Sequence, residues 1–252
     1  MHNVAVPAGE PAPPPDGTTL LAKTAELGEY FALSTPDDGE WQELSLLFDD
    51  AAVVDFVDRT RNAIAASTRC APGSIPVKLA ASSFQLGISA RLLSPVVGAA
   101  TCFGTVPLLN RQSLTWQPTS KHFPRFAITD VHWVEAPTPS QAAALIAGSL
   151  LTGVLGPLNA KLRSLTSLSS QVAWGNVISA ANGAVTVVSM SQPQHESAGR
   201  ALVRALMEIE PLIGTGSFAH GRFVRRSCCL FYQAPRGGLC GDCVLAVSGR
   251  TH

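Results

Sequence analysis

Four of the six cysteines in this 252-residue chain lie between positions 228 and 243, and this clustering constrains the fold more than any other feature. Cys240 and Cys243 form a Cys-x2-Cys pair, in which Gly241 allows a turn tight enough to aim two thiolates at one metal ion. Cys228 and Cys229 are adjacent, and adjacent side chains point to opposite faces of an extended strand. The backbone must therefore bend if both are to reach one site. The spacing predicts a metal centre.

Two kinds of metal centre fit this spacing. Zinc commonly takes Cys-x2-Cys pairs and needs no redox chemistry, so the four cysteines could form a structural zinc knuckle. A cluster that spans two irons tolerates adjacent cysteines better than one tetrahedral ion does, but spacing alone does not fix the metal. Disulfides are disfavoured, because the early segment is proline-rich and does not resemble a secretory signal.

The residues around the cysteines make the pattern more specific. Arg225 and Arg226 precede the double cysteine, an aromatic Phe-Tyr pair follows it, and a Gly-Gly-Leu-Cys-Gly-Asp-Cys run ends at Cys243. In these residues the chain resembles the carboxy-terminal signature of the FhuF-like siderophore ferric reductases. Weaker similarity extends over most of residues 75–243, through the stretch 90–98 and the Trp-Gly-Asn sequence 174–176.

The resemblance implies a cofactor and an activity. In that family four cysteines ligate a [2Fe-2S] cluster, and here they would be Cys228, Cys229, Cys240 and Cys243. The implied function is a cytoplasmic enzyme that reduces siderophore-bound Fe(III) to Fe(II) by one-electron transfer and so releases the iron. The substrate would be a ferric siderophore of hydroxamate type, and the electron donor a ferredoxin or a flavoprotein reductase. No catalytic side chain is needed beyond the cluster.

Two other functions compete with the reductase. The first is a protein in which the four cysteines hold a structural zinc ion, and the second is a [2Fe-2S] sensor of iron or redox state. A sensor that regulates genes should carry a basic helix-turn-helix, and the sequence shows no such motif. The reductase is therefore the leading hypothesis.

Five residues are candidates for substrate contact. Each also has a structural interpretation, because an arginine commonly pairs with a nearby anion and an indole commonly packs in the core. Trp174 and Asn176 flank Gly175, whose small size leaves room for a ligand or for a close helix contact. The full set is Arg91, Trp174, Asn176, Arg222 and Arg225.

Composition limits the partners. Eighteen Lys and Arg residues balance eighteen Asp and Glu residues, so no basic face that could follow a nucleic-acid backbone is expected. Because 46% of the residues are hydrophobic and 14% are charged, the chain can bury a sizeable core. The low charge also predicts an apolar surface patch that would allow peripheral membrane association. The uncharged residues 142–160 are interrupted by glycine and proline, which favours a buried helix in a soluble protein over a membrane span.

The predicted fold class is α+β, with a mostly helical body, a small antiparallel sheet and a loop-rich carboxy-terminal iron-sulfur module. Residues 1–17 are expected to be a disordered proline-rich tail, residues 18–213 the body and residues 214–252 the cluster-binding module. Strands are predicted at 114–117 and 126–135 as an antiparallel pair, and at 222–226. Helices are predicted from Thr18 or Thr19 to 31, from Asp49 or Asp50 onward, from Ser74 to about 93 with a kink or stop at Pro95, and at 140–164, 169–188 and 194–210.

Overall fold

The computed structural model describes residues 16–247, so nearly all of the predicted tail 1–17 lies outside the described residues. Helices dominate the described part, and three small antiparallel sheets accompany them, which confirms the α+β class with a mostly helical body. The α-helices are α1 (Gly17–Ala25), α2 (Asp50–Thr68), α3 (Val77–Phe103), α4 (Pro139–Ile146), α5 (Gly156–Thr166), α6 (Ser170–Ser191), α7 (Glu196–Leu206) and α8 (Val244–Val247).

The strands are short and belong to separate sheets. Strand β3 lies between β1 and β4 in the first sheet, β2 pairs with β5 in the second, and β6 pairs with β7 in a hairpin. The strands are β1 (Gln42–Glu43), β2 (Thr105–Pro107), β3 (Leu114–Gln117), β4 (Arg125–Ile128), β5 (Trp133–Glu135), β6 (Gly216–Ala219) and β7 (Arg222–Arg225).

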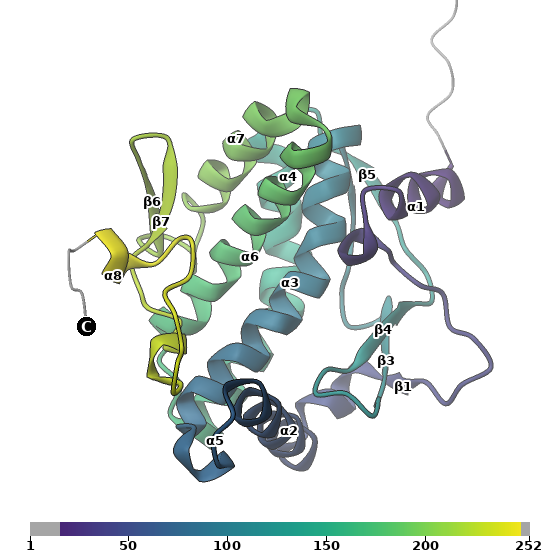
Figure 1. The fold of residues 1–252 in the computed structure, drawn as a ribbon. Helices are drawn as coiled ribbons and strands as arrows, with labels where there is room; N and C mark the ends of the chain where they lie inside the picture. Colours follow the sequence, from purple (N-terminus) through teal and green to yellow (C-terminus); the bar gives the residue numbers. More distant parts are fainter. Residues whose placement is uncertain (1–15, 248–252) are drawn as a thin grey trace, which may run out of the picture.

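Helices α3 and α6 lie side by side through the middle of the molecule (Figure 1). Helix α7 packs against both α4 and α6, and α2 packs against α3. The faces that meet carry buried apolar side chains such as Phe84, Leu92, Ile178 and Val185. Burying a side chain of this size contributes about 1.5–3 kcal/mol, so this helical layer supplies most of the core.

The limits of α3 correct the sequence prediction. The helix begins at Val77 and not at Ser74, which lies in a short 3-10 turn. It also passes through Pro95 without stopping, and ends where Gly104 adopts a left-handed φ of 65°. A proline inside a helix costs about 3 kcal/mol. The buried side chains on both sides of it, including Leu93 and Val96, offset that cost by packing in the core.

The predicted helix at 140–164 is continuous but not uniform. Between α4 and α5 the segment η4 (Ala147–Leu155) is π-helical, which the periodicity did not indicate. By length and composition, three helical stretches of the described residues could cross a membrane: Val77–Phe103, Pro139–Thr166 and Ser170–Ser191. Of their most apolar windows, 61, 50 and 56% of the residues are buried inside the protein. These helices therefore use much of their apolar surface to pack against the rest of the fold.

The predicted strand pair is only partly correct. Residues 114–117 do pair antiparallel with residues 125–128. Residues 133–135, expected in the same strand, form β5 and pair with β2 in a different sheet. Alternation of apolar side chains marks extended backbone but does not identify the partner, because pairing depends on contacts distant in the sequence.

The first helix is shorter than predicted. Asp16, and not Thr18 or Thr19, caps α1, since its carboxylate accepts a hydrogen bond from the Thr19 amide at 2.7 Å. The helix ends at Ala25, and Gly28 with a φ of 131° separates it from the 3-10 turn η1 (Glu29–Phe31). Only glycine adopts that backbone conformation at low cost, so the predicted continuation to residue 31 is interrupted there.

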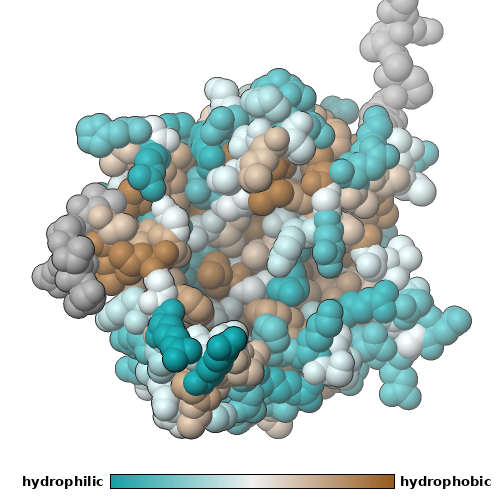
Figure 2. All heavy atoms as spheres, in the orientation of Figure 1, coloured by the Kyte–Doolittle hydropathy of each residue, from teal (hydrophilic) through white to brown (hydrophobic). Residues whose placement is uncertain are grey.

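The carboxy-terminal segment packs on the helical layer. After the β6–β7 hairpin the chain forms an irregular stretch, residues 226–243, that we call the cysteine loop. In Figure 1 this loop is drawn in yellow beside α3 and α6. Figure 2 shows apolar surface gathered in the same area.

Candidate metal centre

The bend that adjacent cysteines require is present in the cysteine loop. Leu230, directly after Cys229, adopts a left-handed φ of 71°, and its amide donates a hydrogen bond to the Cys228 sulfur at 3.3 Å. The 3-10 turn η6 (Phe231–Gln233) follows at once. The chain therefore turns within a few residues. Because the backbone is not extended here, the side chains of Cys228 and Cys229 need not point in opposite directions.

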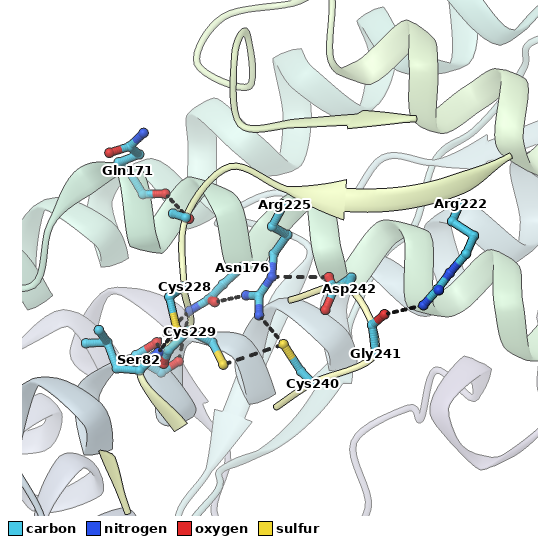
Figure 3. A network of polar contacts seen from close by, with 12 residues as sticks. Ser82, Gln171, Asn176, Arg222, Arg225, Cys228, Cys229, Cys240, Gly241 and Asp242 are labelled. Carbon is cyan, nitrogen blue, oxygen red and sulfur yellow. Dashed lines mark hydrogen bonds and ion pairs between the residues drawn. The ribbon is translucent and has the colours of Figure 1, made fainter. Parts of the chain in front are cut away.

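Two of the four clustered thiols are in contact. The Sγ atoms of Cys229 and Cys240 lie 3.9 Å apart, although ten residues separate them in the chain (Figure 3). Two thiolates bound at about 2.3 Å to one tetrahedral metal lie roughly 3.8 Å apart, so this spacing fits two ligands of the same ion. Folding alone thus arranges one half of a metal centre.

The other two cysteines are near but not assembled with this pair. Cys243 is buried at the end of the Cys-x2-Cys turn, where its amide donates to the Cys240 carbonyl at 3.1 Å. Cys228 is half-buried, and burial raises the pKa of its thiol. Among residues 16–247 no three His, Cys, Asp or Glu side chains converge closely enough to hold a metal ion. Cys228 and Cys243 would complete the ligand set.

A buried arginine lies against the cysteine pair. Arg225, the last residue of β7, is 1% exposed, and its Nη2 donates a hydrogen bond to the Cys240 sulfur at 2.8 Å (Figure 3). Its Nη1 donates to Asn176 Oδ1 at 2.7 Å. Its Nε forms an ion pair with Asp242 Oδ2 at 3.1 Å, without the alignment of a hydrogen bond. Burial lowers the pKa of Arg225, but the negative charges of Asp242 and the cysteines outweigh this effect and raise it.

The same contacts set the protonation of the thiols. The hydrogen bond between Cys229 and Cys240 lowers the pKa of Cys229 to about 5 and raises the pKa of Cys240, because the two sulfurs share one proton. The positive charge of Arg225 stabilises the resulting thiolate. A thiolate is the form that binds metals, so the lowered pKa of Cys229 favours its ligating form.

The helical layer holds this arrangement in place. Asn176 on α6 is fully buried and donates to the carbonyl and the hydroxyl of Ser82 on α3, at 3.1 and 3.0 Å. The Ser82 hydroxyl in turn donates to the Cys229 carbonyl at 2.8 Å. Both central helices are therefore connected to the cysteine loop through a continuous chain of buried hydrogen bonds (Figure 3).

Gly175 allows the loop to approach α6. A Cβ atom at this position would come within 2.1 Å of Ser227 Oγ, a distance that no real contact allows. Ser227 uses that hydroxyl to donate to the Gln171 carbonyl at 2.9 Å. The small residue in the Trp-Gly-Asn sequence thus allows a close contact of α6 with the cysteine loop, and not with a second helix as the sequence suggested.

The structure places the five candidate substrate residues in different surroundings. Arg225 and Asn176 are buried and have partners inside the protein, and Arg222 is exposed and donates to the Gly241 carbonyl at 3.3 Å. Trp174 lines a different cavity, of about 410 Å³, with residues of α5. Arg91 on α3 lines a cavity of about 530 Å³ whose wall includes Cys229 and Cys240. For all five, contact with substrate stays a prediction.

The remaining cysteines lie outside the loop. Cys70 follows the end of α2, and its sulfur lies 3.3 Å from the Thr68 hydroxyl. Cys102 is half-buried near the end of α3, where burial raises the pKa of its thiol to about 11. Neither belongs to the group of four clustered cysteines.

The cysteine loop is also the part of the chain that matches a known family. Residues 225–245 match the family model of the FhuF 2Fe-2S C-terminal domain. The chain carries a FhuF-type 2Fe-2S domain. No curated protein matches the chain. The match begins at the buried Arg225 and includes all four clustered cysteines, so the cofactor is a [2Fe-2S] cluster and the chain is an iron-sulfur protein with a redox centre.

The residues of the FhuF-type domain fit such a cluster. Four cysteines supply the thiolates, the 3.9 Å pair has the spacing of two ligands on one metal, and Arg225 offsets negative charge. Cys228, Cys229, Cys240 and Cys243 are accordingly the predicted ligands. Thiolate ligands give a cluster a low reduction potential. Hydrogen bonds from N–H groups to sulfur, and nearby positive charge, raise that potential.

Sequence reasoning missed three members of this site. Asp242 lies between Cys240 and Cys243 in the sequence. This position could have indicated that its carboxylate pairs with Arg225. Ser82 and Phe123 gave no such signal. They reach the site only because the fold brings α3 and the segment between β3 and β4 beside the cysteine loop.

Proposed function

We propose that the protein is a ferric-siderophore reductase that delivers one electron from its [2Fe-2S] cluster to chelated Fe(III). The observation that carries this proposal is a FhuF-type 2Fe-2S domain in which two predicted cluster ligands, Cys229 and Cys240, line a cavity. A ligand in that cavity would lie beside two of the side chains that would hold the cluster.

The chemistry matches a one-electron centre. Siderophores hold ferric iron through hard oxygen donors, which favour the higher charge. Adding one electron lowers the charge of the iron and weakens the chelate, so Fe(II) is released. The bound cluster supplies that electron, and an external one-electron donor, a ferredoxin or a flavoprotein reductase, restores it. The chain itself must bind the chelate and hold it close, and no acid or nucleophile is required.

A reducing compartment suits this chemistry. Thiolate ligands and a low-potential cluster persist where thiols stay reduced, so we propose a cytoplasmic location. On cell fractionation, we expect the protein in the soluble fraction, or released from membranes by salt if its apolar surface binds them weakly. Recovery only with detergent, after both high-salt and carbonate washes, would contradict this location.

Single-turnover oxidation tests the activity. Protein reduced anaerobically by a chemical donor is mixed with a ferric trihydroxamate and a ferrous chelator, and the cluster spectrum is followed. We expect reoxidation with trapping of up to one Fe(II) per cluster. The same ligand loaded with Ga(III), which matches Fe(III) in charge and size but accepts no electron, should leave the cluster reduced.

The controls separate the competing functions. Equal reoxidation by the gallium and iron complexes would overturn the reductase proposal. Failure of hydroxamate, catecholate and carboxylate ferric complexes alike to reoxidise the cluster would also overturn it, and a [2Fe-2S] sensor would then be the better hypothesis.

A further inference from the structure

The cavity beside the cysteine pair is formed by elements far apart in the sequence. Its lining includes Ser83, Leu86 and Arg91 of α3 and Leu239 of the cysteine loop. Phe123, from the segment between β3 and β4, closes one side. Its volume of about 530 Å³ lies within the range of about 300–1,000 Å³ typical of small-molecule sites.

Large apolar side chains around this cavity are exposed to solvent. Tyr30, Phe231 and Leu239 line it and are 54, 38 and 47% exposed. Exposed apolar side chains that gather around a hollow are costly in water and commonly mark a binding site. A ligand with a hydrocarbon backbone would cover these side chains and gain the free energy of removing them from water.

Arg91 gives the cavity one positive charge. Its guanidinium stacks 4.1 Å from the Phe123 ring centre, and its Nη1 donates to the Gly87 carbonyl at 3.1 Å. Within residues 16–247 no carboxylate forms an ion pair with it; burial lowers its pKa, and the more distant charge of Glu29 opposes this only in part. The remaining donors of the guanidinium are therefore available to an acceptor in the cavity.

We infer that this cavity is the docking site of the iron chelate, that Arg91 donates to the oxygen atoms around the metal, and that the site selects chelates of low net charge. The inference rests on the proposed function and identifies where and how its substrate binds. Because Cys229 and Cys240 line the cavity, a docked complex would lie beside two of the side chains that would hold the cluster.

The charge of the cavity determines which chelates it accepts. Three hydroxamates neutralise Fe(III), whereas three catecholates give a complex with three negative charges. Moving a multiply charged anion from water into an apolar cavity is costly, and a single arginine offsets only part of that cost. The nearby thiolate-ligated cluster is itself negative and would repel such an anion further.

Binding of gallium complexes tests this site without electron transfer. The holoprotein is dialysed against the Ga(III) complex of a linear trihydroxamate, and bound gallium is measured at equilibrium. We expect saturable binding to the wild type. Ser83→Phe places a ring in the cavity and should weaken binding at least tenfold, and Arg91→Gln removes the donors and should weaken it about tenfold. Both variants should keep the visible spectrum of the cluster. This spectrum is the control for correct folding.

A matched variant controls for loss of an arginine. Arg111 stacks 5.4 Å from the Phe48 ring centre and is not among the residues that line this cavity, so Arg111→Gln should bind the gallium complex as the wild type does. A gallium tris-catecholate should bind the wild type at least tenfold more weakly than the trihydroxamate. Tighter binding of the tris-catecholate would overturn the charge selectivity.

The outcomes distinguish this inference from the proposed function. Unchanged gallium binding in both Ser83→Phe and Arg91→Gln, or no saturable binding to the wild type, would overturn the docking site. Reoxidation of the cluster by ferric complex at the wild-type rate in Ser83→Phe would overturn it as well and leave the reductase proposal standing. Normal gallium binding without reoxidation by the iron complex would overturn the reductase proposal and leave the docking site standing.

Discussion

Two arginines lie near the cysteine pair, and their surroundings differ. Arg225 is 1% exposed, and Asn176, Cys240 and Asp242 contact its guanidinium. Arg91 lines the cavity whose wall includes Cys229 and Cys240, and its contacts are aromatic rings and a single carbonyl. Both were candidates for substrate contact by sequence, where Arg225 stands beside the clustered cysteines and Arg91 lies far from them.

The difference assigns them different roles. A buried charge whose partners are all within the protein is part of the structure, because removing it leaves those partners unpaired in a low dielectric. A charge at a cavity wall without a carboxylate partner can exchange water for a ligand. Arg225 therefore belongs to the cluster's surroundings, and Arg91 to the docking site that we infer.

The largest expected effect is the loss of the cluster itself. Cys240→Ser removes one of the two thiols 3.9 Å apart, and we expect no [2Fe-2S] absorption and less than half of the wild-type iron and sulfide per chain. Cys70→Ser, at the end of α2, is the matched control and should keep all of it. A full-colour cluster in Cys240→Ser together with its loss in Cys70→Ser would contradict the ligand assignment.

Replacing Arg225 should destabilise the protein and shift the cluster potential. Arg225→Gln leaves the Asp242 carboxylate without its ion-pair partner, and breaking such a buried pair costs about 3–5 kcal/mol. The midpoint potential should also fall, because a positive charge near the cluster stabilises its reduced form. Thermal unfolding and a redox titration followed by electron paramagnetic resonance measure both effects.

The neighbouring arginine provides the control for this prediction. Arg226 is exposed, so Arg226→Gln should change neither stability nor potential appreciably. Arg225→Lys keeps the charge but not the planar fork, and should restore much of the potential and less of the stability. If Arg225→Gln had the wild-type potential, Arg225 would have no electrostatic role at the cluster.

A smaller effect is expected where α6 meets the cysteine loop. Gly175→Ala would place a Cβ 2.1 Å from Ser227 Oγ, so the loop must shift, at a cost of about 1–3 kcal/mol. Ser227→Ala removes that oxygen, and the next atom, Ser227 Cβ, lies at 3.5 Å, an ordinary contact. The double variant should therefore recover most of the stability lost in Gly175→Ala. Additive losses in denaturant unfolding would show that this contact is not the cause.

The smallest effect concerns a thiol outside the site. The pKa of Cys102 is raised to about 11, so about one molecule in a thousand carries the thiolate at pH 8. Alkylation by iodoacetamide should be about 100-fold slower than for a free cysteine peptide and should rise tenfold per pH unit below pH 11. Peptide mapping measures this rate. Alkylation at the free-peptide rate would show that burial does not protect Cys102.

Much of the fold followed from local sequence signals. The start signal at Asp49 or Asp50 and the helical pattern at 169–188 predicted α2 and α6, because such signals act within one helix. The course of α3 through Pro95 was not predictable in this way. It depends on how much apolar surface the neighbouring helices cover, and that is a property of the assembled core.

The site also has a part that local sequence signals predict and a part that they do not. The four cysteines and Asp242 are close in sequence, so the spacing of the cysteines alone is enough to indicate a metal centre. The contacts of Asn176, Ser82 and Arg91 with this region span long stretches of chain, and a single sequence contains no measure of such distances. The distinct roles of Arg91 and Arg225 are thus visible only in the folded protein.

The most direct test of the account is the proximity of a bound chelate to the reduced cluster. The Cr(III) complex of a trihydroxamate is paramagnetic and inert, and the Ga(III) complex is its diamagnetic counterpart. Competition between the two complexes establishes that the site is saturated. The bound chromium complex should then shorten the electron spin relaxation time of the reduced cluster, and the bound gallium complex should not. Identical relaxation with both complexes bound would contradict docking beside Cys229 and Cys240.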